Sequence, residues 1–325
     1  MPKVFVSRRL AQQAIDMLSQ YAEVDVWKGE DAPPRDEFLR RIADVDGIVL
    51  WGEDKIDGAA MDAAPKLKLI ANVSVGYDNI DIEAAAKRGI MASNTPGVVT
   101  ESTADLTMAL MLAIARRLVE MASLPAKGEW KLWGPMDMLG HDVHHKTLGI
   151  IGMGRIGSAV ARRAKGFSMR VIYHNRHRHP DEAELGVEYV ADIPTLLREA
   201  DFVSIHVPLT AETKHLIGAK ELAMMKPTAF LINTARGKVV DQQALYQALK
   251  RRQIAGAAID VTYTEPIPKD DPLLSLDNII VTPHIGTQTG ETGVNMSVLA
   301  VENMIAALKG EPVPNCVNCH LLGKE

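Results

Sequence analysis

A strand–turn–helix segment near the middle of the chain constrains its fold more than any other feature. The apolar run 148–151 leads directly into Gly152, Gly154 and Gly157 in GxGxxG spacing, and a helical pattern follows from Ser158. Such glycines let the backbone approach a pyrophosphate closely, and the helix N-terminus supplies N–H donors and a positive dipole end. In this setting the pattern favours a dinucleotide site over a purely structural glycine turn.

Length and composition limit the remaining possibilities. A chain of 325 residues corresponds to about two domains, and a hydrophobic fraction of 47% is ample for two cores. The net charge of −5 does not favour binding to nucleic acid or to an anionic membrane surface. No apolar run suggests a signal peptide or a membrane span, and two cysteines do not make a disulfide framework. We therefore expect a cytoplasmic protein.

Short apolar runs alternate with amphipathic stretches along almost the whole chain. In the first hundred residues, strands are predicted at 3–7, 23–27, 46–50 and 67–73, and helices at 9–21, 35–43, 57–64 and 81–88. After a long helical run at 99–122 and an irregular segment at 134–145, six strands are predicted at 147–151, 169–173, 201–207, 228–233, 256–260 and 278–282. A final helix is predicted at 296–308. This rhythm indicates parallel sheets covered by helices on both faces.

The pattern predicts an α/β protein with two Rossmann-like domains. We place a dinucleotide-binding domain at 99–290, inserted into a flavodoxin-like substrate domain formed by 1–98 and 291–325. The helices near residues 100 and 296 are then the crossovers between the two domains.

The end of the second strand after the glycine motif bears on the cofactor. In NAD-binding sheets a carboxylate about 20 residues beyond the glycines binds the ribose hydroxyls. Here the strand leads into Asn175 and Arg176, and no Asp or Glu occurs before Asp181. An arginine pairs well with a 2′-phosphate, so the sequence favours NADP(H), although NAD(H) remains possible if Arg176 is only a solvated loop residue. The histidines at 174, 177 and 179 are interleaved with arginines, so we predict no metal site there.

Three polar segments follow predicted strands of the second block and include Arg236, Glu265 and His284. The carboxyl ends of parallel strands are where open α/β sheets bind ligands. Beside a nicotinamide, Arg236 can bind the carboxylate of a 2-oxo acid and polarise its ketone, and His284 can protonate the oxygen. Glu265 can hold the imidazolium and raise its pKa. Taken singly, each could be a surface or loop residue; their order after the glycine motif favours a catalytic set.

With these motifs, the chain resembles the D-isomer-specific 2-hydroxyacid dehydrogenases along nearly its whole length. The resemblance rests on SVGYDNID at 74–81, GMGRIG at 152–157, HVPLT at 206–210, NTARG at 233–237, DVTYTEP at 260–266 and TPHIG at 282–286. It implies two Rossmann-like domains with the active site in the cleft and a catalytic trio of Arg236, Glu265 and His284. It also implies that the backbone N–H groups of Val75 and Gly76 hold the substrate carboxylate.

The same resemblance, together with the glycine motif and the second strand's end, supplies a set of cofactor contacts. These are Thr103, Gly152, Gly154, Arg155, Ile156, Gly157, Asn175, Arg176, Val207, Pro208, Thr213, Thr234, Ala235, Arg236, Asp260, His284 and Gly286.

Within the family, the segment 130–135 is similar to that of glyoxylate and hydroxypyruvate reductases, in which a dimerisation arm carries a Trp toward the partner's active site. The resemblance implies a homodimer in which Trp133 shapes the neighbouring pocket or anchors the interface. Trp51 is a further candidate to line the pocket, with a structural role as the alternative. Formate dehydrogenases have Gln at the position of Glu265, so the chain departs from them, whereas phosphite dehydrogenases keep a similar trio.

We therefore expect an NADPH-preferring reductase of small 2-oxo acids, with glyoxylate and hydroxypyruvate as substrates. Three alternatives remain: a larger substrate such as 2-ketogluconate, another 2-oxo acid as for other D-2-hydroxyacid dehydrogenases, and a dinucleotide-sensing corepressor without enzymatic activity. The tail sequence from Cys316 to His320 matches the CxxCH pattern of haem attachment. Because no export signal is evident, two reduced thiols are expected instead.

Overall fold

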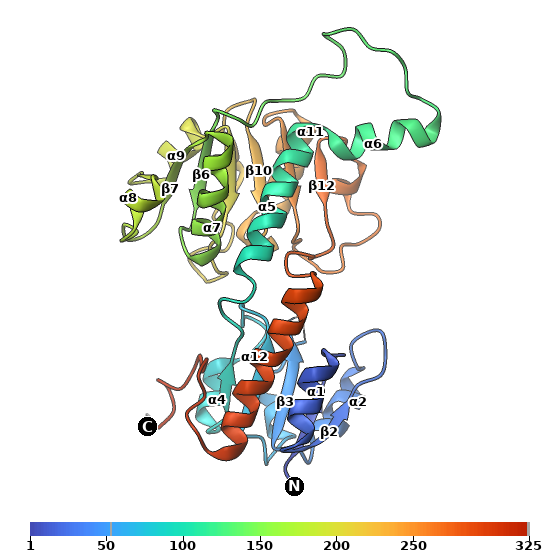
Figure 1. The fold of residues 1–325 in the computed structure, drawn as a ribbon, viewed down its shortest axis with the longest axis vertical. Coiled ribbons are helices and arrows are strands. Elements are labelled where there is room, and N and C mark those ends of the chain that lie inside the picture. The colour runs from blue at the N-terminus through green and yellow to red at the C-terminus, as the bar shows by residue number, and fades with distance from the viewer. Residues whose placement is uncertain (53, 324–325) are drawn as a thin grey trace. The chain divides into compact units, whose positions relative to one another are not determined.

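The computed structural model describes residues 1–52 and 54–323, and the chain divides into two units. Unit 1 comprises residues 1–99 and 287–325, and unit 2 comprises residues 100–286. The sequence predicts a substrate domain at 1–98 and 291–325 and a dinucleotide-binding domain at 99–290. Residues 53, 324 and 325 of the predicted substrate domain lie outside the described residues. The chain thus enters unit 2 at the start of one helix and leaves it just before another (Figure 1).

Unit 1 is built on a parallel sheet of five strands in the order β2-β1-β3-β4-β5, the flavodoxin-like order. The strands are β1 (Lys3–Val6), β2 (Glu23–Val26), β3 (Gly47–Trp51), β4 (Leu69–Val73) and β5 (Met91–Ser93). The interior strand β4 is apolar on both sides apart from Asn72, because helices bury both faces of the sheet.

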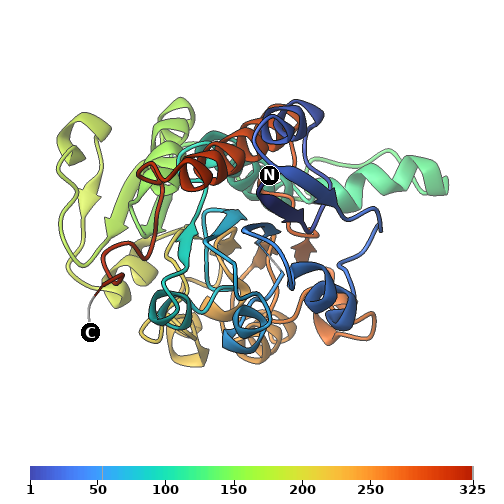
Figure 2. The ribbon, with the colours of Figure 1, turned by 90° about the horizontal axis from the view of Figure 1, so that it is seen from below.

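Helices cover the unit 1 sheet on both sides. They are α1 (Gln12–Ser19), α2 (Arg35–Ile42), α3 (Gly58–Asp62), α4 (Ile82–Lys87) and α12 (Gly290–Lys309). Figure 2 shows α1 and α12 on one face and α2, α3 and α4 on the other. Alternate residues of each strand enter the two cores: Val4 and Val6 pack with α1 and α12, whereas Phe5 packs with α2.

Unit 2 contains a parallel sheet of seven strands in the order β12-β11-β10-β9-β6-β7-β8. The strands are β6 (Thr147–Ile151), β7 (Arg170–His174), β8 (Glu188–Tyr189), β9 (Phe202–Ile205), β10 (Phe230–Asn233), β11 (Gly256–Ile259) and β12 (Ile279–Val281). The strand order reverses between β6 and β9, which are neighbours in the sheet. A doubly wound sheet binds its ligand at this switch point, outside the carboxyl ends of the strands.

The helices of unit 2 form a layer on each side of its sheet. They are α5 (Thr100–Ala115), α6 (Leu118–Lys127), α7 (Arg155–Ala164), α8 (Glu182–Leu185), α9 (Ile193–Glu199), α10 (Ala219–Leu222) and α11 (Gln242–Lys250). One core joins α5 and α7 to the sheet, and the other joins α9, α10 and α11 to its opposite face. The predicted fold class, two parallel-sheet α/β domains, is confirmed.

Three details of the predicted secondary structure are wrong. The run 99–122 is not one helix, because Arg117 adopts a left-handed conformation (φ 51°) and separates α5 from α6. Two strands, β5 and β8, were not predicted, because three and two residues are too few to show a periodic pattern.

Among residues 1–52 and 54–323, none of the helices, the apolar α5 included, combines the length and hydropathy needed to cross a bilayer.

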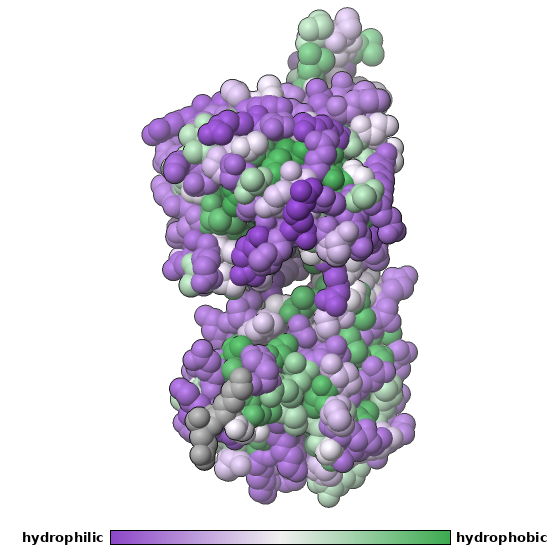
Figure 3. All heavy atoms as spheres, turned by 90° about the vertical axis from the view of Figure 1, so that its left-hand side faces the viewer, coloured by the Kyte–Doolittle hydropathy of each residue, from purple (hydrophilic) through white to green (hydrophobic). Residues whose placement is uncertain are grey.

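Residues 118–139 form an arm that extends from unit 2 (Figure 1), and its end rises above the rest of that unit in Figure 3. Helix α6 buries none of its residues. Apolar side chains along the arm are instead exposed, namely Leu118, Val119, Trp130, Leu132, Trp133, Met136, Met138 and Leu139. Such an exposed apolar set marks an interaction surface.

Candidate active site

The glycine motif lies in the turn from β6 to α7, and two of its glycines are required by close packing. Gly152 has a φ of 100°, and a Cβ there would lie 2.7 Å from the carbonyl carbon of His206. A Cβ at Gly157 would lie 2.3 Å from the carbonyl oxygen of Gly152. Both contacts involve backbone that cannot move aside, so only glycine fits at these positions.

Gly154 differs, because a Cβ there would meet no heavy atom of the protein within 4 Å. Its φ of −87° is accessible to any residue, so neither packing nor conformation within the chain demands a glycine. Gly154 is the N-cap of α7, whose first turn contains no acidic residue. Open space in front of a helix N-terminus free of carboxylates fits the pyrophosphate of a dinucleotide.

The loop after β7 contains two arginines, Arg176 and Arg178, whose surroundings differ. Asn175 Oδ1 accepts a hydrogen bond from the Met153 N–H (2.7 Å), which ties this loop to the glycine turn. Arg178 pairs with Glu182 and lies over the Tyr189 ring, 5.2 Å from its centroid. Arg176 is exposed and, among the residues that the structure describes, has no hydrogen-bond or ion-pair partner. Its guanidinium is therefore available to an anion.

The structure brings His284 and Glu265 into direct contact, although they are 19 positions apart in the sequence. His284 Nδ1 lies 2.7 Å from Glu265 Oε2, and Glu265 Oε1 accepts a hydrogen bond from the Thr262 N–H at 2.9 Å. Glu265 thus holds the imidazole ring through Nδ1, and Nε2 is the other ring nitrogen. The side chains keep 34% and 25% of their exposure, which leaves the pair accessible to a substrate.

Arg236 follows β10 and is near enough to Glu265 and His284 for its charge to affect them. Its Nη1 donates to the carbonyl oxygen of Ala235 (2.9 Å), and Asn233 Nδ2 donates to the carbonyl oxygen of Arg236 (3.0 Å). The positive charge of Arg236 acts on both Glu265 and His284. The three predicted residues thus interact at the carboxyl edge of the unit 2 sheet.

The pKa values of two histidines at this edge, His284 and His206, are shifted in opposite directions. The hydrogen bond to Glu265 raises the pKa of His284, and it outweighs desolvation and the repulsion by Arg236. Burial acts to raise the pKa of Glu265, but its bonds to His284 and Thr262 outweigh burial and lower the pKa. His206, which contacts Ser204 Oγ at 2.8 Å, has its pKa lowered to about 4 by desolvation. His284 is therefore the histidine suited to hold a proton near neutral pH.

Asp260 has a structural role that the sequence did not reveal. This residue is 1% exposed, and its carboxylate accepts hydrogen bonds from Thr282 Oγ1 (2.6 Å), the Ile285 N–H (2.8 Å) and the Gly286 N–H (2.8 Å). Its carbonyl oxygen accepts from the His284 N–H at 2.9 Å. These bonds enclose His284, whose φ of 54° is unusual for a residue with a side chain. Asp260 thus holds the His284 loop in shape.

The remaining predicted cofactor residues lie around the same edge. Thr234 Oγ1 contacts Thr107 Oγ1 of α5 (2.9 Å), and Thr107 Oγ1 donates to the Thr103 carbonyl oxygen (2.8 Å). In the loop after β9, Thr213 Oγ1 donates to the Pro208 carbonyl oxygen at 2.6 Å. Arg155 and Ile156 open α7, and Val207, Ala235 and Gly286 follow β9, β10 and β12. Apart from Thr103 on α5, these positions lie at or beyond strand ends.

In unit 1, the predicted substrate residues Val75 and Gly76 belong to the loop after β4. Asn72, which is fully buried, donates from Nδ2 to the Gly76 carbonyl oxygen (2.8 Å), and Asn94 Nδ2 donates to the Val75 carbonyl oxygen (2.8 Å). Both carbonyls are thereby held by side chains. The sequence signal that was missed is an asparagine inside the apolar run of β4. Trp51 ends β3 and packs against the unit 1 core, which accords with its structural alternative.

The expectation of two reduced tail thiols is wrong, because Cys316 and Cys319 form a disulfide. Asn318 lies between them in the sequence, is fully buried and accepts a hydrogen bond from the Ala92 N–H at 2.8 Å. Among the described residues, no group of three or more His, Cys, Asp and Glu side chains is arranged to hold a metal ion.

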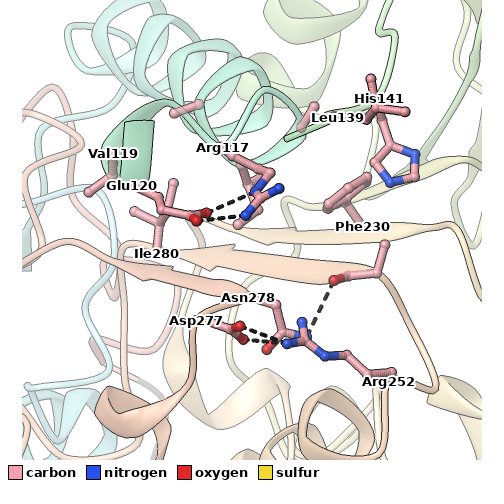
Figure 4. Close-up of a pocket in the computed structure, with 14 residues that line it drawn as sticks. Arg117, Val119, Glu120, Leu139, His141, Phe230, Arg252, Asp277, Asn278 and Ile280 are labelled. Carbon is pink, nitrogen blue, oxygen red and sulfur yellow. Dashed lines mark hydrogen bonds and ion pairs between the residues drawn. The ribbon is translucent and has the colours of Figure 1, made fainter. Parts of the chain in front are cut away.

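A cavity of about 310 Å³ lies elsewhere in unit 2 (Figure 4). Phe230 and Asn278 line it from the amino ends of β10 and β12, the edge opposite the catalytic residues. Arg117 paired with Glu120 and Arg252 paired with Asp277 also line it. The arm residues Val119 and Leu139 contribute as well. This cavity is therefore separate from the predicted site.

The doubly wound sheet, the glycine turn and the histidine–carboxylate pair at the strand ends define a dinucleotide-dependent oxidoreductase. A family model described as D-isomer specific 2-hydroxyacid dehydrogenase, NAD binding domain, matches residues 108–286. The chain belongs to the D-isomer-specific 2-hydroxyacid dehydrogenase family, and it is an enzyme that acts on a CH–OH group.

Three relatives illustrate the similarity. A glyoxylate reductase of Korarchaeum cryptofilum is 52% identical over 319 residues, which cover 98% of this chain and 96% of the relative. The crystal structure of a Thermus thermophilus protein is similar with a TM-score of 0.91 and 47% identity, covering 97% and 99% of the two chains. A Sinorhizobium meliloti NADPH-dependent glyoxylate/hydroxypyruvate reductase in complex with NADP and malonate has a TM-score of 0.84 and 32% identity, covering 100% and 99%.

Proposed function

We propose that this enzyme reduces glyoxylate and hydroxypyruvate with NADPH. The observation that carries the proposal is the His284–Glu265 pair, a proton donor of raised pKa at the carboxyl edge of a dinucleotide-binding sheet. The name of the Korarchaeum relative, which is 52% identical over nearly the whole chain, supports glyoxylate as the substrate.

Each member of the trio has a distinct part in this reaction. The nicotinamide, when bound, supplies the hydride. Protonated His284 donates its Nε2 proton to the substrate oxygen, and Glu265 stabilises the imidazolium from Nδ1 and orients the ring. Arg236 binds the substrate carboxylate through its planar fork and polarises the ketone. Asp260, with both carboxylate oxygens already engaged by the 282–286 loop, keeps His284 in position while it lies near the cofactor.

The residues of the glycine turn hold the cofactor. The N–H groups at the start of α7, including Arg155 and Ile156, face the space in front of Gly154, where the pyrophosphate fits. The other predicted contacts, from Thr103 to Gly286, surround the same strand ends and are proposed to bind the remainder of the dinucleotide.

For the substrate, we propose that the N–H groups of Val75 and Gly76 hold the carboxylate. The carbonyls of both residues are fixed by asparagine side chains, so the peptide N–H groups of this loop are preorganised. The protein is proposed to be a cytoplasmic homodimer in which the exposed arm packs on the partner and Trp133 shapes the partner's pocket. Trp51 is proposed to line the pocket only by its exposed edge, since it packs on the core.

A turnover assay with a panel of 2-oxo acids and both cofactors tests the proposal. We expect the highest kcat/KM for glyoxylate and hydroxypyruvate with NADPH. A clear preference for 2-ketogluconate would replace the substrate assignment. Binding of dinucleotide without turnover of any 2-oxo acid would favour a sensing role and contradict the proposal.

The cofactor preference has its own test in the double variant Asn175→Asp, Arg176→Ala. Aspartate keeps the oxygen that accepts the Met153 N–H and adds the carboxylate that binds ribose hydroxyls, so the preference should move toward NADH. The matched control is Arg178→Ala, which removes the same charge from the same loop but from a guanidinium already paired with Glu182. A double variant with an unaltered NADPH:NADH ratio would refute the assignment of Arg176.

A further inference from the structure

The C-terminal tail closes the exposed edge of the unit 1 sheet. Strand β5 is the last strand of that sheet, and Ser93 forms an antiparallel bridge with Cys316. The Val317 N–H donates to the Ala92 carbonyl oxygen at 2.8 Å. Figure 1 shows this tail running beside α4, in the same unit. An edge strand presents unpaired N–H and C=O groups, and the tail satisfies those of β5.

One side chain between the two cysteines anchors this attachment. Asn318 is fully buried, its Oδ1 accepts from the Ala92 N–H (2.8 Å), and its Nδ2 donates to the Ile90 carbonyl oxygen (2.9 Å). The disulfide closes a four-residue ring around this anchor. Cys319 is exposed and Cys316 is half-buried, so a thiolate from solution can reach the ring at Cys319.

The tail is linked to the loop that we propose binds the substrate carboxylate. The carbonyl oxygen of Asn315 accepts from the Asn94 N–H (3.2 Å), and Asn94 Nδ2 donates to the Val75 carbonyl oxygen (2.8 Å). Asn303 of α12, also fully buried, bridges the same two elements: its Nδ2 donates to the Asn94 carbonyl oxygen, and its Oδ1 accepts from the Asn315 N–H. Looser attachment of the tail therefore loosens the support of Val75.

We propose that Cys316 and Cys319 form a reversible dithiol–disulfide site, a redox latch that fixes the tail on β5 and thereby orders the Val75–Gly76 loop. The effect on substrate binding rests on the proposed function, whereas the effect on the tail does not. Disulfides of cytosolic proteins are commonly transient and redox-sensing, which fits a site that an external thiol can reach.

The exchange is a two-electron reaction with a dithiol. A thiolate of the dithiol attacks Cys319 Sγ, the Cys316–Cys319 bond breaks, and Cys316 leaves as a thiolate that takes up a proton. The second thiol of the reagent loses its proton and displaces Cys319 from the mixed disulfide. The protein then holds two thiols, and the reagent leaves as a cyclic disulfide. Oxidation by a cyclic disulfide runs the same steps in reverse.

The experiment compares full-length protein with and without dithiothreitol, using mass spectrometry to count thiols and hydrogen exchange to follow segments 90–95 and 313–318. Because the disulfide restricts a four-residue loop, reduction should speed exchange in both segments about tenfold. The KM for glyoxylate should rise about threefold, with kcat and the Kd for NADPH unchanged. The double variant Cys316→Ser, Cys319→Ser should behave like the reduced protein and ignore dithiothreitol.

Two results would overturn the latch: unchanged exchange in both segments after complete reduction, or failure of the reduced protein to re-form the Cys316–Cys319 disulfide with excess glutathione disulfide, which would release two glutathione thiols. Faster exchange with an unchanged KM would refute the link to the Val75 loop. If no 2-oxo acid is turned over, the proposed function fails, but the exchange measurement still decides the latch.

Discussion

Replacing Glu265 with glutamine tests the central pair of the site. The substitution keeps the size of the side chain but removes the negative charge 2.7 Å from His284 Nδ1. A hydrogen bond to a charged group contributes about 1.5–3 kcal/mol, and the partial exposure of both side chains places this pair toward the lower end of that range. At about 1.4 kcal/mol per decade of rate, kcat/KM should fall roughly 10- to 30-fold at pH 8.

The sign of the pH dependence follows from the proton that His284 is proposed to donate. Glu265 raises the pKa of His284, so the protonated ring persists to higher pH in the native enzyme. Without that charge the pKa falls, and the loss of reductase activity on raising the pH begins earlier. The deficit of the variant should therefore shrink as the pH is lowered, until the imidazole is protonated in both enzymes.

The assay is the pH profile of kcat/KM for glyoxylate reduction, with the Kd for NADPH measured alongside. Asp270→Asn is the matched control, because it removes one negative charge from the exposed loop after Glu265. We expect the control to keep the native profile and both variants to keep the native Kd. A Glu265→Gln enzyme whose activity is reduced equally at every pH, with an unshifted profile, would refute the argument.

Four further substitutions test other parts of the site. Gly154→Ala should leave Tm within about 1 °C of native but weaken NADPH binding about tenfold. Gly157→Ala places a Cβ against the Gly152 carbonyl and should lower the free energy of unfolding by about 1–3 kcal/mol, measured by thermal unfolding. Equal stability of the two variants would contradict the packing argument. Arg236→Lys should raise the KM for glyoxylate about tenfold, because an ammonium lacks the planar fork, and unchanged kinetic constants would remove Arg236 from the site. In Asp260→Asn, one of the three groups that donate to the carboxylate would face the NH2 group of the amide instead of an oxygen. The variant should therefore lose about 1–3 kcal/mol of unfolding free energy and have a lower kcat. A native kcat would refute the positioning role of Asp260.

Much of the fold was predictable because its signals are local. Each strand of the unit 2 sheet except β8 is an apolar run long enough to recognise, and the glycine turn joins two such elements within about ten residues. Since the strands are parallel, residues that follow them must gather at one edge, which is why Arg236, Glu265 and His284 could be grouped without coordinates. Arg117 could not be predicted as a break, because nothing about an arginine in a helical pattern favours a left-handed conformation.

By itself the sequence determined the class of fold, and it predicted which residues form the dinucleotide site and the catalytic set. Only the tertiary structure showed that Glu265 contacts Nδ1 of His284 and that the Asp260 carboxylate accepts hydrogen bonds from the 282–286 loop. It also showed that Asn72 and Asn94 hold the carbonyls of Gly76 and Val75. It also joined Cys316 to Cys319 and left the arm exposed. Hydrogen bonds of this kind link segments far apart along the chain. Their partners depend on which strands become neighbours and in what register, and no local pattern encodes that information.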